Sequence, residues 1–197
     1  MLVIDGLSRL YFIPDRKVQR TQENFSRWCW LSTKKKIIII LSFLISSIVI
    51  DQYTKVLAMQ KLKNTPTQTF WADTFRLQYA ENNGAFLSLG SGLSEATRFW
   101  TFTVVVTGFL GGLAVYLFKK RDLSTLEAIS YALVLGGGIG NLIDRWARSG
   151  WVVDFMNMGI GELRTGIFNV ADAVIMAGMF GLIYQSFTQK QQKTTQN

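Results

Sequence analysis

The side chains able to do acid–base chemistry in this sequence are limited by what it lacks. The 197 residues include no histidine and one cysteine, Cys29. Catalysis by a Ser-His-Asp or Cys-His group and zinc binding through histidine are therefore excluded. A lone thiol forms no internal disulfide. Any acid–base chemistry must come from carboxylates, lysine or tyrosine.

Two aspartates, Asp154 and Asp172, have no lysine or arginine three or four positions away in either direction. Local sequence therefore offers them no neutralising partner. Two carboxylates that face one pocket share a proton, because both cannot readily ionise at short range. The ionised one takes a proton from water while the neutral one donates to a carbonyl oxygen. Such a pair would hydrolyse a peptide bond without metal or a covalent intermediate, although spacing alone leaves a structural role open.

Other polar side chains lie inside apolar stretches, where ionisable groups are rare and mark functional sites. They form pairs three or four positions apart on one helix face, namely Asp51 with Lys55, Asn141 with Arg145, and Asn169 with Asp172. At about 1.5 Å per residue, all fall in the outer third of a roughly 30 Å apolar core. This shared depth predicts one buried site built from several helices. We interpret Asp51–Lys55 and Asp144–Arg145 as structural ion pairs, because paired charges are tolerated in membranes.

Four apolar stretches can position these groups in a membrane. Each approaches the about 20 mostly apolar residues that a bilayer-spanning helix needs. They cover 37–58, 99–118, 126–143 and 167–187. With 49% hydrophobic and 17% charged residues, the chain is predicted to be an all-α membrane protein, a four-transmembrane-helix bundle.

Basic residues predict how this bundle is oriented. The net charge of +8 is concentrated before the first stretch, between the second and third, and after the fourth. Lysine and arginine near span ends mark the cytoplasmic side. We expect a cytoplasmic N-terminal tail (1–33), a four-span domain (34–188) and a cytoplasmic C-terminal tail (189–197). This distribution argues against nucleic acid as a partner, and the polar cluster after the first apolar run argues against a cleaved signal peptide.

Two connections on the outer side have strand character. Segments 69–75 and 75–79 are rich in β-prone residues and precede an Asn-Gly pair at 83–84, which is a strong turn signal. They predict a small hairpin on the outer surface. Segment 150–155 is predicted to be a short strand that returns towards the membrane and carries Asp154.

Four sequence blocks follow one another along the chain. The blocks are D-Q-Y-T-K at 51–55, E-N-N-G-A-F at 81–86, G-G-G-I-G-N-L-I-D-R at 136–145 with V-V-D-F at 152–155, and F-N-V-A-D at 168–172. In these blocks and their order the sequence resembles the bacterial lipoprotein signal peptidases (signal peptidase II) over about 36–187. The resemblance implies an intramembrane aspartic endopeptidase of the bacterial cytoplasmic (inner) membrane, free of metal and cofactor. Its fold would be four helices with a small extracytoplasmic β-cradle.

The resemblance also implies a substrate and residue roles. The expected reaction is removal of the signal peptide from prolipoproteins, by cleavage on the N-terminal side of a diacylglyceryl-modified cysteine. The expected partners are lipid-modified prolipoproteins and membrane lipids, with a monomer favoured. Asp154 and Asp172 match the catalytic pair, while Asp51, Lys55 and Asp144 match structural polar positions. The residues that match positions around the substrate or the pair are Asn82, Gly84, Asn141, Arg145 and Asn169.

Three features depart from the family pattern. Segment 164–167 replaces a proline-containing lead-in, segment 82–90 lacks a second alanine after its glycine, and the tail 1–33 is longer than usual. Two other functions are alternatives to a peptidase. A proton-coupled transporter is disfavoured because no inverted repeat is visible, and an inactive scaffold would not need to retain both aspartates.

Overall fold

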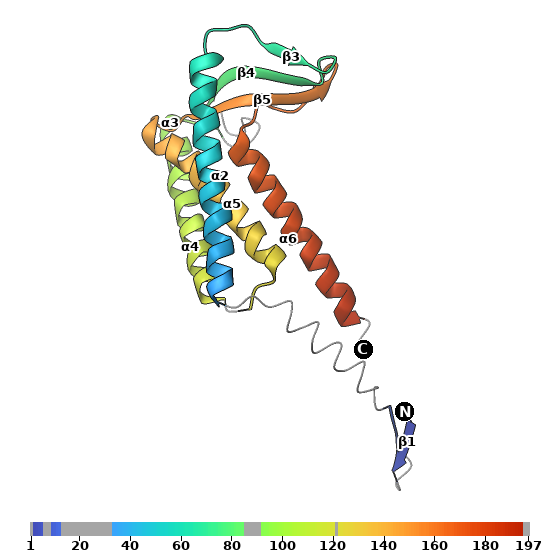
Figure 1. Ribbon diagram of the computed structural model, residues 1–197. Coiled ribbons are helices and arrows are strands. Elements are labelled where there is room, and N and C mark those ends of the chain that lie inside the picture. Colours follow the sequence, from blue (N-terminus) through green and yellow to red (C-terminus); the bar gives the residue numbers. More distant parts are fainter. Residues whose placement is uncertain (1, 6–8, 13–32, 85–91, 121, 195–197) are drawn as a thin grey trace.

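The computed structural model describes residues 2–5, 9–12, 33–84, 92–120 and 122–194. Within these residues, four helical segments are long and apolar enough to cross a membrane (Figure 1), as predicted. They are α2 (Thr33–Lys61), the continuous run of α3 (Glu95–Arg98), π-helical η2 (Phe99–Val105) and α4 (Val106–Lys119), then α5 (Thr125–Ala147) and α6 (Val170–Thr194).

The two ends of the chain differ from the predicted pattern, and some predicted features lie outside the described residues. Helix α6 continues past the predicted end of the four-span domain at 188. Near the N-terminus, β1 (Leu2–Asp5) and β2 (Arg9–Phe12) pair as antiparallel strands that the sequence had not indicated. Cys29 and the end of the E-N-N-G-A-F block lie outside the described residues.

Helix α5 is the centre of the bundle. In the most apolar 18-residue stretch of α5, 61% of the residues are buried, against 11–17% in the corresponding stretches of the other three spans. It begins at a capping box, in which the Glu127 amide donates to Ser124 Oγ over 3.1 Å and the Ser124 amide donates to Glu127 Oε2 over 2.9 Å. Its glycines allow close contact on different faces, because a Cβ at Gly136 would lie 2.8 Å from Ser47 of α2 and one at Gly138 would lie 2.7 Å from Leu110 of α4.

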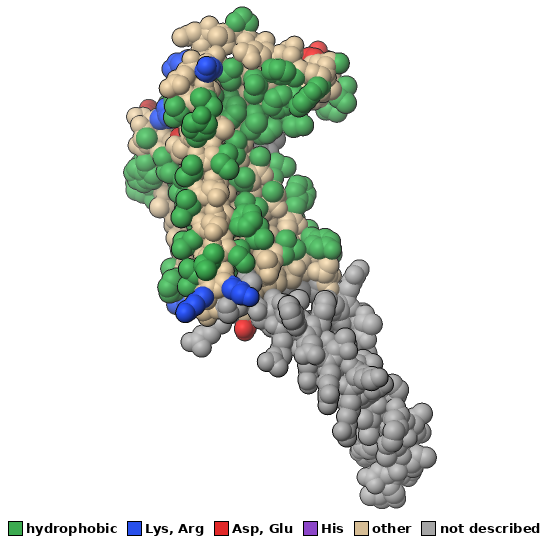
Figure 2. All heavy atoms as spheres, in the orientation of Figure 1, with side chains coloured by type: hydrophobic (Ala, Val, Ile, Leu, Met, Phe, Trp, Pro, Cys, Tyr) green, Lys and Arg blue, Asp and Glu red, His purple; other side chains and the backbone are tan. Residues whose placement is uncertain are grey.

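The other three spans turn large apolar side chains outward. Ile38, Phe109 and Phe180 are each more than 60% exposed, and hydrophobic side chains cover much of the bundle surface in Figure 2. Such a surface is unfavourable in water and suits the hydrocarbon core of a bilayer. The chain is therefore a multi-pass membrane protein.

A four-stranded antiparallel sheet lies across the end of the bundle where α2 ends and α6 begins (Figure 1). Its order is β3 (Gln68–Phe70), β4 (Phe75–Asn82), β5 (Val152–Ile160) and β6 (Leu163–Arg164). The predicted hairpin and the returning strand are therefore present, and the strand is longer than expected.

The turn of this hairpin is not where the sequence placed it. The chain reverses between β3 and β4 through Trp71, Ala72 and Asp73, which have φ of 50°, 50° and 66°. The Asn-Gly pair at 83–84 instead follows the end of β4. Side-chain bonding explains the difference, because the Asp73 carboxylate accepts from Arg76 Nε over 2.7 Å and holds a left-handed turn that lacks glycine.

Candidate active site

The motif F-N-V-A-D forms the start of α6 and orients its aspartate. The Asp172 amide donates to Asn169 Oδ1 over 3.0 Å, and the Asn169 amide donates to Asp172 Oδ2 over 3.2 Å. This reciprocal pair is a capping box with asparagine and aspartate as its two members. It explains the three-residue spacing and holds the Asp172 carboxylate in the first turn of α6.

Asp154 approaches the same region from the sheet. It pairs with Ala80 of β4, so that Asn82 is its diagonal neighbour on the same face. Asn82 Nδ2 donates to Asp154 Oδ2 over 2.8 Å, and Asn169 Nδ2 donates to Asp154 Oδ1 over 2.6 Å. Asn169 therefore contacts both aspartates, one through its side chain and the other through its backbone.

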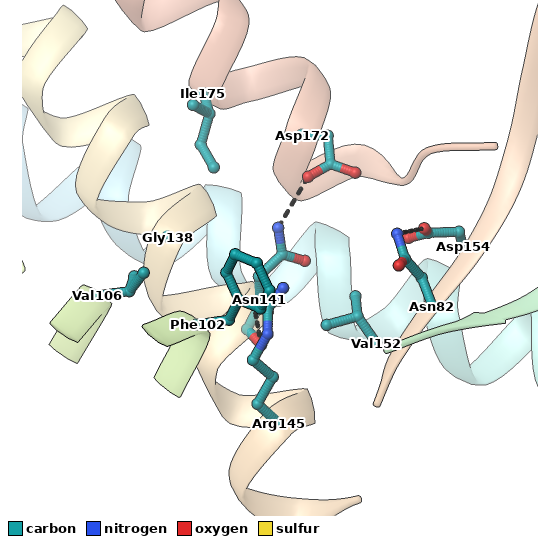
Figure 3. A pocket seen from close by; sticks show the side chains of 10 residues that line it. All are labelled: Asn82, Phe102, Val106, Gly138, Asn141, Arg145, Val152, Asp154, Asp172 and Ile175. Carbon is teal, nitrogen blue, oxygen red and sulfur yellow. Dashed lines mark hydrogen bonds between the residues drawn. The ribbon is translucent and has the colours of Figure 1, made fainter. Parts of the chain in front are cut away.

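Both aspartates line a cavity of about 150 Å³ between α5, α6, the η2–α4 run and the sheet (Figure 3). The cavity is lined by Asn82, Phe102, Val106, Gly138, Asn141, Arg145, Val152, Asp154, Asp172 and Ile175. Figure 3 shows the carboxylate of Asp172 entering from α6 and that of Asp154 entering from β5. Asn141 on α5 faces α6, where it donates to Asp172 Oδ1 over 2.9 Å.

The environment of Asp154 favours a shared proton. Burial first, and the negative charge of Asp172 second, raise the pKa of Asp154 to about 7, against the lowering effect of the Asn82 and Asn169 hydrogen bonds. Among the described residues, neither Asp154 nor Asp172 forms an ion pair with a lysine or arginine. A buried carboxylate pair of this kind can hold one proton and one charge near neutral pH.

Lys55 lies at the centre of the buried ion cluster beside the cavity. Its Nζ is 2.8 Å from Asp51 Oδ2 and 3.0 Å from Asp144 Oδ2, with all three side chains at most 1% exposed. The predicted pairing of Asp51 with Lys55 is therefore confirmed. Asp51 also accepts from the Ala171 amide over 2.9 Å and so attaches α2 to the start of α6.

The predicted pairing of Asp144 with Arg145 is wrong. Adjacent residues on a helix point in different directions, and Asp144 instead contacts Lys55 and, at 3.5 Å, Arg148 Nε. Arg145 turns to the cavity, where Nη2 donates to the Gly84 carbonyl over 2.9 Å and Nη1 donates to the Asn141 carbonyl over 3.4 Å. Its buried Nε has no partner within the described part of the chain. Gly84 therefore contacts Arg145 through its backbone carbonyl.

The apolar wall of the cavity was not predicted. Phe102, Val106, Val152 and Ile175 look like ordinary span or strand residues, and only the four-residue spacing of the first two hints at a common face. Gln52, within the D-Q-Y-T-K block, was not predicted to join helices either. It donates to the Gly140 carbonyl over 3.1 Å and thereby joins α2 to α5.

Comparison with known proteins places the chain in a family. Residues 38–188 match the model of signal peptidase (SPase) II. A lipoprotein signal peptidase of Sphingopyxis alaskensis is 39% identical over 73% of this chain and 82% of the relative. One of Halothermothrix orenii is 36% identical over 73% and 91%.

A solved structure shows the same fold. It is described as a bacterial membrane enzyme determined by the in meso method at 2.3 Å resolution, and it matches with a TM-score of 0.68 at 24% identity. The match covers 83% of this chain and 94% of that chain. From the family match and its relatives, this chain belongs to the signal peptidase II family of aspartic peptidases.

Proposed function

We propose that this protein removes the signal peptide from prolipoproteins, with Asp154 and Asp172 as its catalytic pair. One observation carries the assignment of the pair. Two carboxylates from separate elements line one cavity, neither forms an ion pair within the described part of the chain, and a single asparagine, Asn169, contacts both. The family match supplies the reaction, and this geometry supplies side chains able to perform it.

The pair would hydrolyse the peptide by general acid–base catalysis. The ionised carboxylate takes a proton from water as the water oxygen bonds to the scissile carbonyl carbon, and the protonated carboxyl donates to the carbonyl oxygen. The tetrahedral intermediate then collapses, the C–N bond breaks and the leaving nitrogen receives a proton from the pair. Asn82, Asn141 and Asn169 keep the carboxylates in position through the hydrogen bonds described above.

Arg145 is suited to binding the substrate backbone. Its guanidinium lies on the cavity, two of its nitrogens are held by backbone carbonyls, and its Nε remains without a partner among the described residues. A buried donor without an acceptor is costly. We propose that a backbone carbonyl of the bound signal peptide accepts from this group.

The substrate is proposed to be cut on the N-terminal side of a cysteine that carries a diacylglyceryl group. The cavity wall formed by Phe102, Val106 and Ile175 is apolar, and the adjacent side chains of Val105 and Met176 are exposed on the bundle surface. A lipid-bearing side chain can therefore lie along the helices while its backbone reaches the aspartates. We propose that the protein lies in the bacterial cytoplasmic membrane with both termini cytoplasmic and the sheet outside, and that it acts as a monomer.

A pair of substrates tests this proposal. Purified protein should cleave a prolipoprotein peptide with a diacylglyceryl-cysteine and leave the same peptide with free cysteine essentially uncut. Equal cleavage of both would refute the lipid requirement. Cleavage of neither would favour a transporter or an inactive scaffold.

A further inference from the structure

The ammonium group of Lys55 has used all of its hydrogen-bonding capacity. It carries three donors and no acceptor. Its three contacts are Asp51 Oδ2 at 2.8 Å, Asp144 Oδ2 at 3.0 Å and Asn141 Oδ1 at 3.0 Å. The first two neutralise charge, whereas the third joins this ion cluster to the side chain that holds Asp172.

The third contact determines which way the Asn141 amide points. Because a lysine only donates, Asn141 must present its oxygen to Lys55, and its NH₂ group is then directed at Asp172 Oδ1, 2.9 Å away. With the amide reversed, an oxygen would face Asp172 and only a protonated carboxyl would be a partner for it. The chain from Lys55 through Asn141 to Asp172 thus has a fixed direction.

Asn169 alone cannot impose this direction. Its Nδ2 lies within reach of Asn141 Oδ1 at 3.1 Å, Val153 O at 3.3 Å and Asp154 Oδ1 at 2.6 Å. Two protons serve these three acceptors, and the shortest contact is to Asp154. Lys55 has one proton for each of its acceptors and is the stronger constraint on Asn141.

We propose that Lys55 is a positioning residue for catalysis, which fixes the orientation of the Asn141 amide and thereby presents Asp172 as a hydrogen-bond acceptor. This inference rests on the proposed catalytic pair and deepens it. A purely structural role, in which Lys55 only neutralises two buried aspartates, predicts a loss of stability alone. The orienting role predicts a change in the chemical step.

The test must separate orientation from charge. The charged and titratable groups around the cavity are Asp51 and Lys55 of α2, Asp144 and Arg145 of α5, Arg148 at the C-cap of α5, Asp154 of β5 and Asp172 of α6. Lys55→Met combined with Asp51→Asn removes the donor but leaves the net charge of this set unchanged. The kcat, KM and pH profile of this double variant should be measured with a diacylglyceryl-cysteine peptide, together with its melting temperature, alone and combined with Asn141→Ala.

The orienting role predicts that the double variant lowers kcat by about 10- to 100-fold, the effect of one misplaced buried hydrogen bond. KM should change little, and the acidic limb of the rate profile should move to higher pH, because a reversed Asn141 favours the protonated pair. Once Asn141→Ala is present, the same double change should lower kcat by no more than about 3-fold. A folded double variant with wild-type kcat and pH profile, or an equal loss in both backgrounds, would overturn the proposal.

Asn141→Asp provides a second test if the double variant fails to fold. An ionised aspartate is a good partner for Lys55 and should keep the protein folded, but it cannot donate to Asp172, so kcat should fall. Wild-type kcat in Asn141→Asp would also overturn the proposal. Asp154→Asn in the same assay tests the catalytic pair separately from Lys55. A wild-type rate in this variant would refute the proposed catalytic pair, and with it the pair that Lys55 is proposed to position.

Discussion

Replacing Asp144 by asparagine should destabilise the protein while leaving substantial activity per folded molecule. The carboxylate is buried 3.0 Å from Lys55 Nζ, and it also accepts from the Val153 amide over 3.2 Å. Across 3.0 Å two unit charges attract by about 5.5 kcal/mol at an effective dielectric constant of about 20, and the desolvation of Asp144 itself offsets part of this attraction. Removing one partner of a buried pair costs about 3–5 kcal/mol. Lys55 keeps its ion pair with Asp51, and an asparagine at position 144 can still accept from the Val153 amide. We therefore expect a destabilisation at the lower end of this range, about 3 kcal/mol.

The assay is thermal unfolding of purified protein in detergent, with cleavage measured on the same samples. About 3 kcal/mol corresponds to a fall of roughly 6–12 °C in Tm for a chain of this size. Lys63→Met is the matched control, because its pair with Glu81 spans 3.3 Å between half-exposed side chains and contributes at most about 1 kcal/mol. An Asp144→Asn variant with wild-type Tm and no activity would refute this reasoning, since Asp144 would then belong to the chemistry.

Three further outcomes follow from the same structure. Burial and the charge of Asp172 raise the pKa of Asp154 to about 7, so the folded protein keeps a proton that the unfolded chain already releases at lower pH. The free energy of unfolding should therefore decrease as the pH rises from about 4 to 7, and Asp154→Asn should flatten a plot of Tm against pH. A Cβ at Gly140 would lie 2.6 Å from Asp51 Oδ2, so Gly140→Ala should lower Tm, whereas Gly108→Ala has open space and should be neutral or stabilising by up to about 1 kcal/mol. Cleavage should survive strong chelators and serine- or thiol-directed reagents, and a loss that zinc restores would contradict a two-carboxylate mechanism.

The sequence predicted the spans because a bilayer imposes a length and composition that the chain displays directly. It also drew attention to Asp154 and Asp172, since an ionisable group without a local partner is unusual in an apolar setting. Both line the cavity in the structure. Spacing along one helix was sufficient for Asp51 with Lys55. For Asn169 and Asp172 it indicated that the two side chains are close, whereas the reciprocal capping bonds come from the structure.

Which individual side chains pair across elements was beyond such reasoning. Asp144 was assigned to its sequence neighbour Arg145, yet its partner Lys55 comes from another helix. The turn at Trp71–Asp73 lacks glycine and so escaped a prediction based on the Asn-Gly signal, although Asp73 and its partner Arg76 are only three residues apart. The apolar cavity wall was missed for the same reason, because Phe102 and Ile175 differ from other span residues only in what they face.

The most direct test of the catalytic pair compares Asp154→Asn, Asp172→Asn and the double variant in cleavage of a diacylglyceryl-cysteine peptide. Each single change keeps the shape of the side chain and should lower kcat by at least about 10²–10⁴-fold in a folded protein. The double variant should be scarcely slower than either, because the two act as a unit. Asp73→Asn, in the sheet turn outside the cavity, should cleave normally. Near wild-type cleavage by folded Asp154→Asn or Asp172→Asn would contradict the assignment of the pair.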